Sequence, residues 1–504
     1  MTVRRVMGIE TEYGVALPGQ PAADPIMWSG RVVQGYVRSA ATNASLPLTS
    51  GWDYADETPL RDARGFSMAR ALADVSQLTD VDDPMIANSV LSNGARLYVD
   101  HAHPEYSSPE VMSPLDAVRW DRAGELVMRQ AADHWAQTGE PVRLYKNNVD
   151  GKGASYGTHD NYLVPRSVPF ADLISGLLPF LIARPAICGA GRVGLGVASQ
   201  GAGFQISARA DYIEAEVGLE TTLKRPIVNT RDEPHASPSV HRRLHLITGD
   251  ATCADVGTLL KVGSTSAVLR LIESDRHPRI ELVDPVAGAR TLSRDPSFAA
   301  TVLSTDGQRL SALDILEAYL VACREAVADE APGWVADSDT QMLLERWQAV
   351  LDQLRVDPSQ LGAQLDWVAK WNLLRGFKDR DDLSWNDPRL QLIDIQYSDV
   401  DLSRGLAAKL RAAGRLESLV SDEAVRAAMV TPPLDTRAWF RGACVARFGA
   451  DVKAASWDSV VLLDRRSRPQ RVGMPEPEGG TESIWADRIA SSTTSADLLE
   501  HLSD

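Results

Sequence analysis

Two carboxylates two residues apart lie almost at the amino terminus, in the segment Met7-Gly8-Ile9-Glu10-Thr11-Glu12-Tyr13-Gly14. Ile9, Thr11 and Tyr13, which alternate with the two glutamates, favour a strand. Because side chains alternate along a strand, Glu10 and Glu12 are expected on one face. Like charges this close raise each other's pKa unless a cation lies between them. The pair therefore indicates either a Mg²⁺ and phosphate site or a half-exposed strand with a polar face.

A second stretch that could do chemistry, Ala95-Arg96-Leu97-Tyr98-Val99-Asp100, alternates strictly between apolar and polar residues. The alternation predicts a strand whose polar face carries Arg96, Tyr98 and Asp100. The chain continues into residues 101–110, where histidine, glutamate and serine are dense. We therefore expect the polar face of this strand to line a catalytic or binding site.

Two later stretches also predict strands with polar faces. Along residues 159–163 the alternation places His159 and Asn161 on one side, although a lone strand histidine is more often structural than a metal ligand. Along residues 242–247, Arg243 and His245 share a face. They could bind a nucleotide phosphate and its metal, or form an ordinary surface pair, and these residues alone leave both alternatives open.

Residues 189–194 form a literal Gly-x-Gly-x-x-Gly motif. The dinucleotide-binding fingerprint requires a short strand before the motif and a helix after it. Here residues 169–187 predict a long apolar helix before the motif, and residues 196–203 remain rich in glycine. We therefore expect a flexible turn rather than a dinucleotide site.

Helices must support these strands. Ser113 and Pro114 are typical of a helix start, and that helix is expected to stop near Gly139. Apolar periodicity predicts further helices at about 26–41, 254–274, 311–328, 339–354 and 358–376. These helices are expected to pack on the outer face of the sheet.

Two regions stand apart from this pattern. The segment from Thr42 to about Asn88 is polar and turn-rich, but its embedded Trp and Tyr residues favour a loop that folds over something rather than a solvated linker. The composition shifts near residues 421–433. A small terminal domain is expected beyond this point, with a helix at 434–447, a strand near 459–463, a basic loop at 465–478 and closing helices.

Length and composition restrict the class of protein. With 504 residues, 44% hydrophobic and 24% charged, the chain predicts a globular protein of about two domains. The net charge of -16 disfavours nucleic-acid and membrane-surface partners. No apolar run of about 18 residues and no signal-peptide pattern occurs, so a cytoplasmic location is expected. The four widely spaced cysteines predict buried free thiols rather than a zinc site or disulfides.

Taken in order, these segments resemble the Pup ligase and Pup deamidase/depupylase family from about residue 6 to beyond 460. The motifs that carry the resemblance are GIETEYG at 8–14, NGARLYVD at 93–100, HPEY at 103–106, KNN at 146–148, SYGTH at 155–159, NTRDEPH at 229–235 and RLH at 243–245. That family is related to glutamine synthetase. The resemblance implies an α+β fold in which residues 1–425 form a curved, mainly antiparallel sheet that binds ATP and Mg²⁺, and residues 426–504 form a small domain.

The insert at about 42–88 resembles the loop that marks the deamidase/depupylase branch. The resemblance therefore implies a hydrolase that converts the carboxy-terminal Gln of the prokaryotic ubiquitin-like protein Pup to Glu and cleaves the isopeptide bond between Pup and lysines of pupylated proteins. A Pup ligase is the alternative, and a non-catalytic Pup or nucleotide binder is a more distant one. Because amide hydrolysis is downhill, ATP is expected to organise the site rather than to drive the reaction.

The resemblance also implies roles for individual residues. The metal positions are Glu10, Tyr98, Glu105, His159 and His245; the nucleotide-contacting positions are Gly8, Ile9, Glu10, Thr11, Glu12, Ser107, Ser108, Gly157 and Arg243; and the catalytic aspartate is Asp100. Glu12 is expected to touch the metal or nucleotide only peripherally. Asp100 could act as a general base, as a nucleophile or through a phosphate derived from ATP.

The resemblance further implies that Pup is acidic and largely disordered. A chain of net charge -16 can bind such a partner only through a local basic groove, on which the partner folds. By neighbourhood alone, the candidates for this groove are Arg192, Arg209, Arg225 and Arg231.

Overall fold

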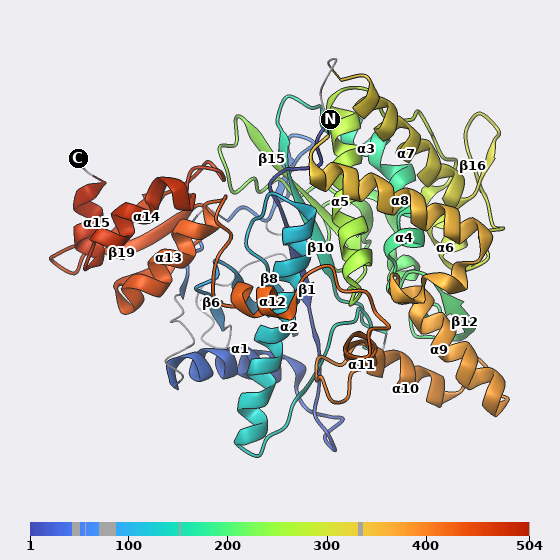
Figure 1. Cartoon of the computed structure of the whole chain (residues 1–504), viewed down its shortest axis with the longest axis horizontal. Helices are drawn as coiled ribbons and strands as arrows, with labels where there is room; N and C mark the ends of the chain where they lie inside the picture. The colour runs from blue at the N-terminus through green and yellow to red at the C-terminus, as the bar shows by residue number, and fades with distance from the viewer. Residues whose placement is uncertain (43–50, 56, 70–86, 151–152, 331–335, 503–504) are drawn as a thin grey trace.

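A six-stranded antiparallel sheet lies at the centre of the computed structural model, which describes residues 1–42, 51–55, 57–69, 87–150, 153–330 and 336–502 (Figure 1). Its strand order is β15-β10-β1-β8-β7-β6. The strands are β1 (Met7–Glu12), β6 (Asn88–Val90), β7 (Arg96–Asp100), β8 (His103–Ser107), β10 (Thr158–Pro165) and β15 (His241–Gly249). The predicted α+β class and antiparallel sheet are confirmed.

The pairing register brings the predicted polar residues together. Along β1, Glu10 lies opposite His159 of β10, and Glu12 lies opposite Glu105 of β8. Tyr98 of β7 also lies opposite Glu105 on its other side. The polar faces of strands that are far apart in sequence therefore form one continuous surface.

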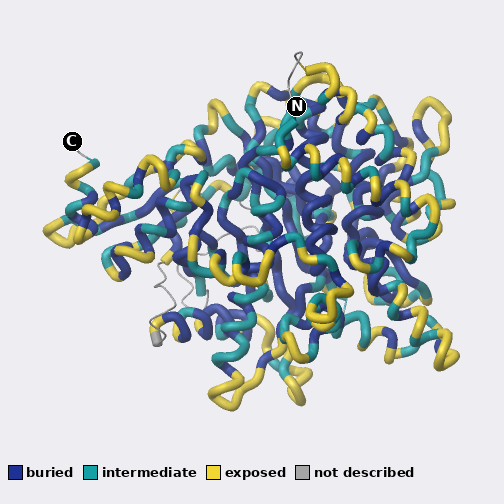
Figure 2. The backbone as a smooth tube through the Cα atoms, in the orientation of Figure 1, coloured by how far each residue is buried: buried dark blue, intermediate teal, exposed yellow. Residues whose placement is uncertain are grey.

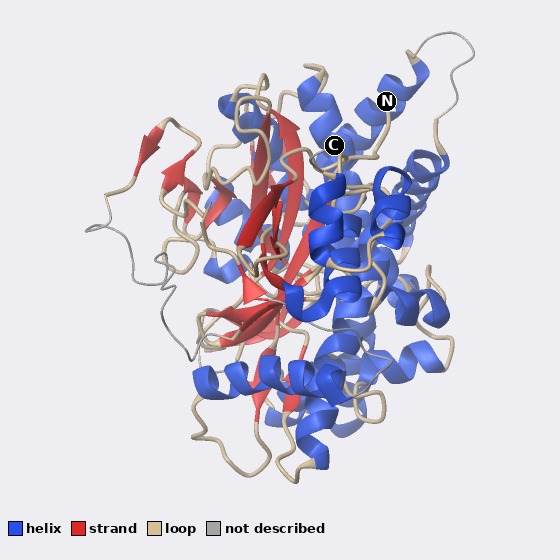
Figure 3. Ribbon diagram, turned by 90° about the vertical axis from the view of Figure 1, so that its left-hand side faces the viewer, coloured by secondary structure: helices blue, strands red, loops and turns tan. Residues whose placement is uncertain are grey.

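Helices cover the apolar face of this sheet (Figure 3). Ile9, Val164 and Leu244 are fully buried in the core on that side, against helices that include α2 (Pro114–Gln137) and α5 (Asp255–Glu273). Each such side chain stabilises the fold by about 1.5–3 kcal/mol. A register shift of one residue would turn these side chains toward solvent and the carboxylates into the core, so burial fixes the register. Figure 2 shows this buried centre.

The predicted helix starts have identifiable causes. Ser113 caps α2, since its hydroxyl accepts a hydrogen bond from the Asp116 N–H at 3.1 Å. The other described helices before residue 430 are α1 (Pro25–Thr42), α3 (Phe170–Ala183), α4 (Pro185–Cys188), α6 (Pro285–Ser293), α7 (Ala312–Ala328), α8 (Ser338–Val356), α9 (Asp366–Asp381), α10 (Pro388–Tyr397), α11 (Leu406–Ala412) and α12 (Asp422–Ala428).

No described helix is long and apolar enough to cross a membrane. The four cysteines are buried and free, as predicted.

Small sheets surround the central one. Antiparallel pairs join β2 (Gly14–Ala16) to β9 (Arg143–Tyr145), β4 (Arg61–Asp62) to β5 (Phe66–Ser67), β11 (Arg192–Leu195) to β12 (Gly201–Gln205), and β16 (Val302–Leu303) to β17 (Arg309–Leu310). A parallel pair joins β13 (Ala215–Gly218) to β14 (Pro226–Asn229).

Two local predictions for the chain before residue 430 were wrong. Residues 189–194 were expected to form only a turn, but β11 begins at Arg192 and pairs with β12; pairing between distant residues offsets the weak strand preference of glycine. The helix predicted at 358–376 is split, because Leu365 is extended between a 3₁₀ turn at Pro358–Ala363 and α9. No helix follows Gly194, consistent with the absence of the dinucleotide fingerprint there.

The carboxy-terminal region builds its own core around a four-stranded sheet of order β20-β19-β18-β3. Its elements are β18 (Val452–Ala455), β19 (Ser459–Leu463), β20 (Pro469–Gly473), α13 (Ala438–Phe448), α14 (Glu482–Ser491) and α15 (Ser495–His501). The strand β20 lies where a loop was predicted, since an exposed polar edge strand lacks the alternation that marks a half-buried one. The fourth strand, β3 (Gly51–Trp52), comes from the insert and pairs in parallel with β18.

A buried ion pair fixes the carboxy-terminal region to the central sheet. Glu110, which follows β8, accepts hydrogen bonds from Arg437 Nε at 2.9 Å and from Arg441 Nη2 at 2.5 Å. Burial opposes ionisation, but the charges of Arg441 and Arg437 hold the pKa of Glu110 at about 2. Both guanidinium groups are themselves buried. The sequence analysis did not anticipate this contact.

We expect Glu110→Gln to destabilise the fold by about 3 kcal/mol, because two buried cations lose their counter-charge. Since the pKa of Glu110 is lower in the folded chain than in the unfolded one, the contribution is present above about pH 4.5 and is lost as the pH falls toward 2. Urea unfolding at pH 7 measures the loss. Asp487→Asn, which changes an exposed carboxylate of α14, is the control, and equal effects of the two changes would contradict the prediction.

Candidate active site

A cavity of about 510 Å³ lies over the polar face of the central sheet. Its floor comes from β1, β7, β8, β10 and β15. The predicted site residues that line it are Glu10, Glu12, Tyr98, Asp100, Glu105, Ser107, Gly157, His159, Arg243 and His245. Residues drawn from most of the first half of the chain therefore meet in one cavity.

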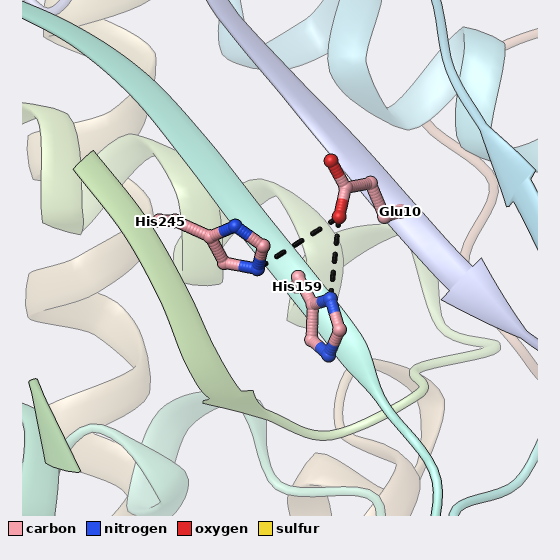
Figure 4. A group of neighbouring side chains, drawn as sticks. All are labelled: Glu10, His159 and His245. Atoms are coloured by element: carbon pink, nitrogen blue, oxygen red, sulfur yellow. Dashed lines mark hydrogen bonds and ion pairs between the residues drawn. The ribbon is translucent and has the colours of Figure 1, made fainter. Parts of the chain in front are cut away.

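The first of two clusters in this cavity is centred on Glu10. Its Oε2 lies 3.2 Å from His159 Nδ1 and 3.9 Å from His245 Nε2, so the two imidazoles flank one carboxylate oxygen (Figure 4). Burial alone would raise the pKa of Glu10, but His245, His159 and Arg243 hold it well below its usual range. Burial, with the charge of Arg243, lowers the pKa of His245. A neutral imidazole beside an ionised carboxylate is a ligand pair that a divalent cation accepts.

Gly157 is required for this cluster. A β-carbon on Gly157 would lie 2.0 Å from His159 Nε2, so any larger residue would force the His159 ring to move. The glycine in the turn before β10 therefore makes room for the imidazole ring above it.

The second cluster contains three carboxylates. One oxygen each of Glu12, Asp100 and Glu105 lie within 4.8 Å of one another. Glu105 is 1% exposed, and its Oε2 makes no hydrogen bond with any described residue. Burial and the charges of Asp100, Glu10 and Glu12 raise the pKa of Glu105 well above its usual range. An orphaned buried carboxylate among like charges is the donor set that a hard cation such as Mg²⁺ would stabilise.

Glu12 is more central than the sequence suggested. Its Oε1 accepts a hydrogen bond from the Gly157 N–H at 2.8 Å, and its Oε2 lies 3.1 Å from His103 Nδ1. The ring of His103 stacks on Tyr156, with 4.1 Å between ring centroids. These contacts orient Glu12 toward Asp100 and Glu105, whereas the sequence analysis expected only a peripheral position.

Tyr98 lies on the cavity floor as its alternation predicted, with the Arg96 guanidinium 4.0 Å from its ring centroid. Burial and the charge of Glu105 raise the pKa of Tyr98 well above its ordinary value. The side chain is therefore a neutral phenol at neutral pH, which binds a cation more weakly than the carboxylates do. Its assignment as a metal ligand stays a prediction.

Asp100 ends β7 at the tip of the β7–β8 hairpin, where the next residue is His101. Its Oδ2 lies 2.9 Å from His101 Nδ1. Burial opposes ionisation, but the charge of His101 holds the pKa of Asp100 at about 2, and Asp100 in turn raises the pKa of His101 to about 9. His101 was not among the predicted site residues. Its position next to Asp100 was the feature of the sequence that could have indicated a role in the site.

The predicted nucleotide residues divide between two places. Gly8, Ile9 and Ser108 line a smaller, largely apolar cavity next to the first, together with Trp457 and Pro477 of the carboxy-terminal region. The side chain of Thr11 faces the other side of the sheet, where its Oγ1 lies 3.4 Å from Asp121 Oδ1. Any contact of Thr11 with a nucleotide would therefore use its backbone.

Three of the four candidate groove arginines, Arg209, Arg225 and Arg231, line the main cavity. Within the described chain, neither Arg209 nor Arg225 forms an ion pair with a carboxylate; each instead donates to backbone carbonyls, Arg209 to Tyr156 O and Arg225 to Ser155 O. Arg192 is buried outside this cavity and donates to Gly196 O. Arg209 is buried and Arg231 pairs with Glu233, so among the three that line the cavity Arg225 is the partly exposed cation without a carboxylate partner in the described chain.

The described part of the insert packs against this rim. The Thr58 N–H donates to Glu233 Oε1 at 2.7 Å, and Thr230 Oγ1 donates to Asp62 Oδ2 at 2.7 Å. Glu57 and Pro59 line the cavity. The insert therefore folds over the site, as its aromatic residues predicted; its residues 43–50, 56 and 70–86 lie outside the described part.

Comparison with known proteins places this geometry in context. A family model described as Pup-ligase protein matches residues 5–461. The depupylase of Acidothermus cellulolyticus is 50% identical over 99% of each chain. The Pup deamidase/depupylase of Mycobacterium tuberculosis is 48% identical, again over 99% of each chain.

Solved structures are similar as well. The Pup ligase PafA in complex with Pup has a TM-score of 0.79 and 31% identity, covering 99% of this chain and 94% of PafA. The structure of PafA in complex with ADP has a TM-score of 0.72 and 35% identity, covering 80% of this chain and 89% of PafA.

Proposed function

The chain belongs to the Pup-ligase protein family, and on this premise we propose that it is a Pup deamidase/depupylase. It hydrolyses the side-chain amide of the carboxy-terminal Gln of Pup and cleaves the isopeptide bond between Pup and a lysine of a conjugated protein. The relative from Acidothermus cellulolyticus is named a depupylase, and the relative from Mycobacterium tuberculosis is named a Pup deamidase/depupylase. Both reactions cleave a carbonyl–nitrogen bond at the same Pup side chain, so one site serves both.

The observation that carries the proposal is the position of Asp100. Its carboxylate is ionised at neutral pH and lies on the cavity floor, and among the described residues it forms an ion pair with His101 alone. Such a group can accept a proton from water or attack the amide carbonyl, and the geometry allows both routes as well as one through a phosphate derived from ATP.

The residues fit Mg²⁺ and a nucleotide. Glu10, His159 and His245 would hold one cation and Glu12 and Glu105 a second, where Mg²⁺ would neutralise phosphate charge and polarise the scissile carbonyl. Arg243 and Ser107 would contact the phosphates, and the apolar cavity beside Trp457 would hold the base. The ADP complex of PafA supports nucleotide use in this fold.

The ligase alternative shares the fold and the site. Its chemistry forms the bond that the hydrolase cleaves and consumes ATP stoichiometrically. The full-length alignment with depupylases and the insert folded against residues 230–233 favour the hydrolase.

The rim arginines lead to a testable expectation for Pup binding. We expect Arg225→Ala to weaken binding of Pup by about tenfold and to reduce its salt dependence, because one desolvated charge pair is lost. Binding of labelled Pup between 50 and 300 mM salt is followed by fluorescence anisotropy. Arg466→Ala, on the exposed turn before β20, is the control. A wild-type affinity that is indifferent to salt would contradict the arginine groove.

The test of the function is incubation of the protein with ATP, Mg²⁺ and a Pup–lysine conjugate. Release of free Pup and intact target, at a rate not matched one for one by ATP turnover, is the expected result. Formation of conjugates from Pup carrying a terminal Glu, with equimolar ADP, would establish the ligase instead. Binding of Pup without either reaction would establish a binding protein.

A further inference from the structure

The side chain of His101 is held at both ends of its ring. Nδ1 lies 2.9 Å from Asp100 Oδ2, and Nε2 lies 3.4 Å from Thr222 Oγ1. Thr222 belongs to the segment between β13 and β14, which also carries Arg225 on the rim of the cavity. His101 therefore connects the Asp100 carboxylate to a segment that lines the cavity.

The backbone at His101 is also unusual. Its φ angle is +52°, a left-handed conformation that side chains other than those of Gly, Asn and Asp rarely adopt. Turn tips of this kind usually carry glycine. Histidine adopts this conformation more readily than most other side chains, and here its ring contacts Asp100 and Thr222.

The three-carboxylate cluster places Asp100 where a cation bound by the other two carboxylates could also bind it. Glu12, Asp100 and Glu105 are close enough to bind one cation together. A cation bound by Glu12 and Glu105 would attract the Asp100 carboxylate as a third ligand, since Mg²⁺ prefers oxygen donors. A carboxylate captured in this way could not also reach the amide.

We propose that His101 is a positioning residue: by donating from Nδ1 to Asp100 Oδ2, it keeps the Asp100 carboxylate directed toward the substrate and prevents its capture as a ligand of the cation. The inference rests on the proposed function for its catalytic part. The cation part concerns residues of this chain alone and is measured without substrate.

Two substitutions separate the hydrogen bond from the other properties of histidine. His101→Asn keeps an N–H donor close to the position of Nδ1 and tolerates a positive φ. His101→Gly tolerates the same backbone but has no donor. Both substitutions remove the positive charge of the imidazolium, so the two variants have the same charge. They differ in whether a side-chain donor can still form the hydrogen bond to Asp100.

The first readout is binding of Mn²⁺ alone to the full-length protein, counted as free Mn²⁺ by electron paramagnetic resonance. His101→Gly is expected to bind Mn²⁺ about fivefold more tightly than His101→Asn, because Asp100 becomes free to act as a ligand. In an Asp100→Asn background the same two changes should give equal affinities, since the additional ligand is gone.

The second readout is cleavage of the Pup conjugate. His101→Gly is expected to lower kcat by about 100-fold with KM nearly unchanged, and His101→Asn to remain within about threefold of wild type, because misorientation of a reacting group acts on the chemical step. Equal kcat values for the two variants would overturn the proposal, and so would equal Mn²⁺ affinities of His101→Gly and His101→Asn when Asp100 itself is unchanged. A wild-type protein that fails to cleave the conjugate refutes the proposed function, and the Mn²⁺ comparison still tests the positioning of Asp100.

Discussion

Asp100→Asn is expected to lower kcat for cleavage of a Pup conjugate by at least about 10³-fold, because the isosteric amide can neither accept a proton nor attack a carbonyl. The substitution keeps the shape of the side chain and one oxygen that can accept the hydrogen bond from His101. It also removes one like charge from the neighbourhood of Glu105. The loss of the ion pair with His101 opposes this gain, so we expect the fold to be no more stable than that of the wild type.

Single-turnover release of the target protein, followed on gels, measures the loss. Glu214→Gln is the matched control, since Glu214 is an exposed carboxylate on the rim of the same cavity. Nucleotide and Pup affinities should stay within about threefold of wild type for both variants, because only the chemical step is altered. If Asp100→Asn cleaved the conjugate within tenfold of the wild-type rate, the catalytic assignment would be wrong.

Glu105→Gln is expected to stabilise the metal-free protein and to lower the activity of the metal-bound protein. In EDTA at pH 8 the variant should be more stable than the wild type, because a buried like charge is removed. With Mg²⁺ and ATP, activity should fall by about 100-fold, since a carboxylate donor to the cation is lost. Thermal denaturation in EDTA measures the first effect, and cleavage of the Pup conjugate with Mg²⁺ and ATP measures the second.

The pH dependence provides an independent check. Folded Glu105 keeps its proton to higher pH than the unfolded chain does, so above about pH 4.5 the native state binds more protons and stability of the metal-free protein falls as the pH rises. Glu105→Gln should remove this slope between pH 6 and 8. Glu110→Gln serves as the comparison, because the pKa of Glu110 is lowered and its loss destabilises. A metal-free Glu105→Gln protein less stable than wild type would refute the repulsion among the carboxylates.

The sequence predicted the strands of the site well, for a physical reason. In β7 and β15 one face is buried and the other polar, so the side-chain period of two is visible in the sequence. The same alternation placed Tyr98 with Asp100 and Arg243 with His245 on shared faces, as the structure shows. The family resemblance then connected strands that no local pattern could bring together.

What the sequence could not predict depends on pairing between distant residues. The position of Glu12 follows from its pairing with Glu105 across β1 and β8, and no local property distinguishes it from Glu10. The contact of His101 with Thr222 joins residues on separate loops. The strand β3 has only two residues, too few for any periodicity, and exists because β18 offers it a partner.

The pairing of β3 with β18 has a consequence for synthesis on the ribosome. Roughly 400 residues separate the two strands in sequence, so at about 5–20 residues per second the early strand waits tens of seconds for its partner to emerge. Until then Trp52, which packs in the core of the carboxy-terminal region, has no such core to enter. The insert can therefore form its last contacts only when translation is almost finished, and a chain truncated before β18 would keep the contacts of the insert with residues 230–233 but lack the pairing of β3.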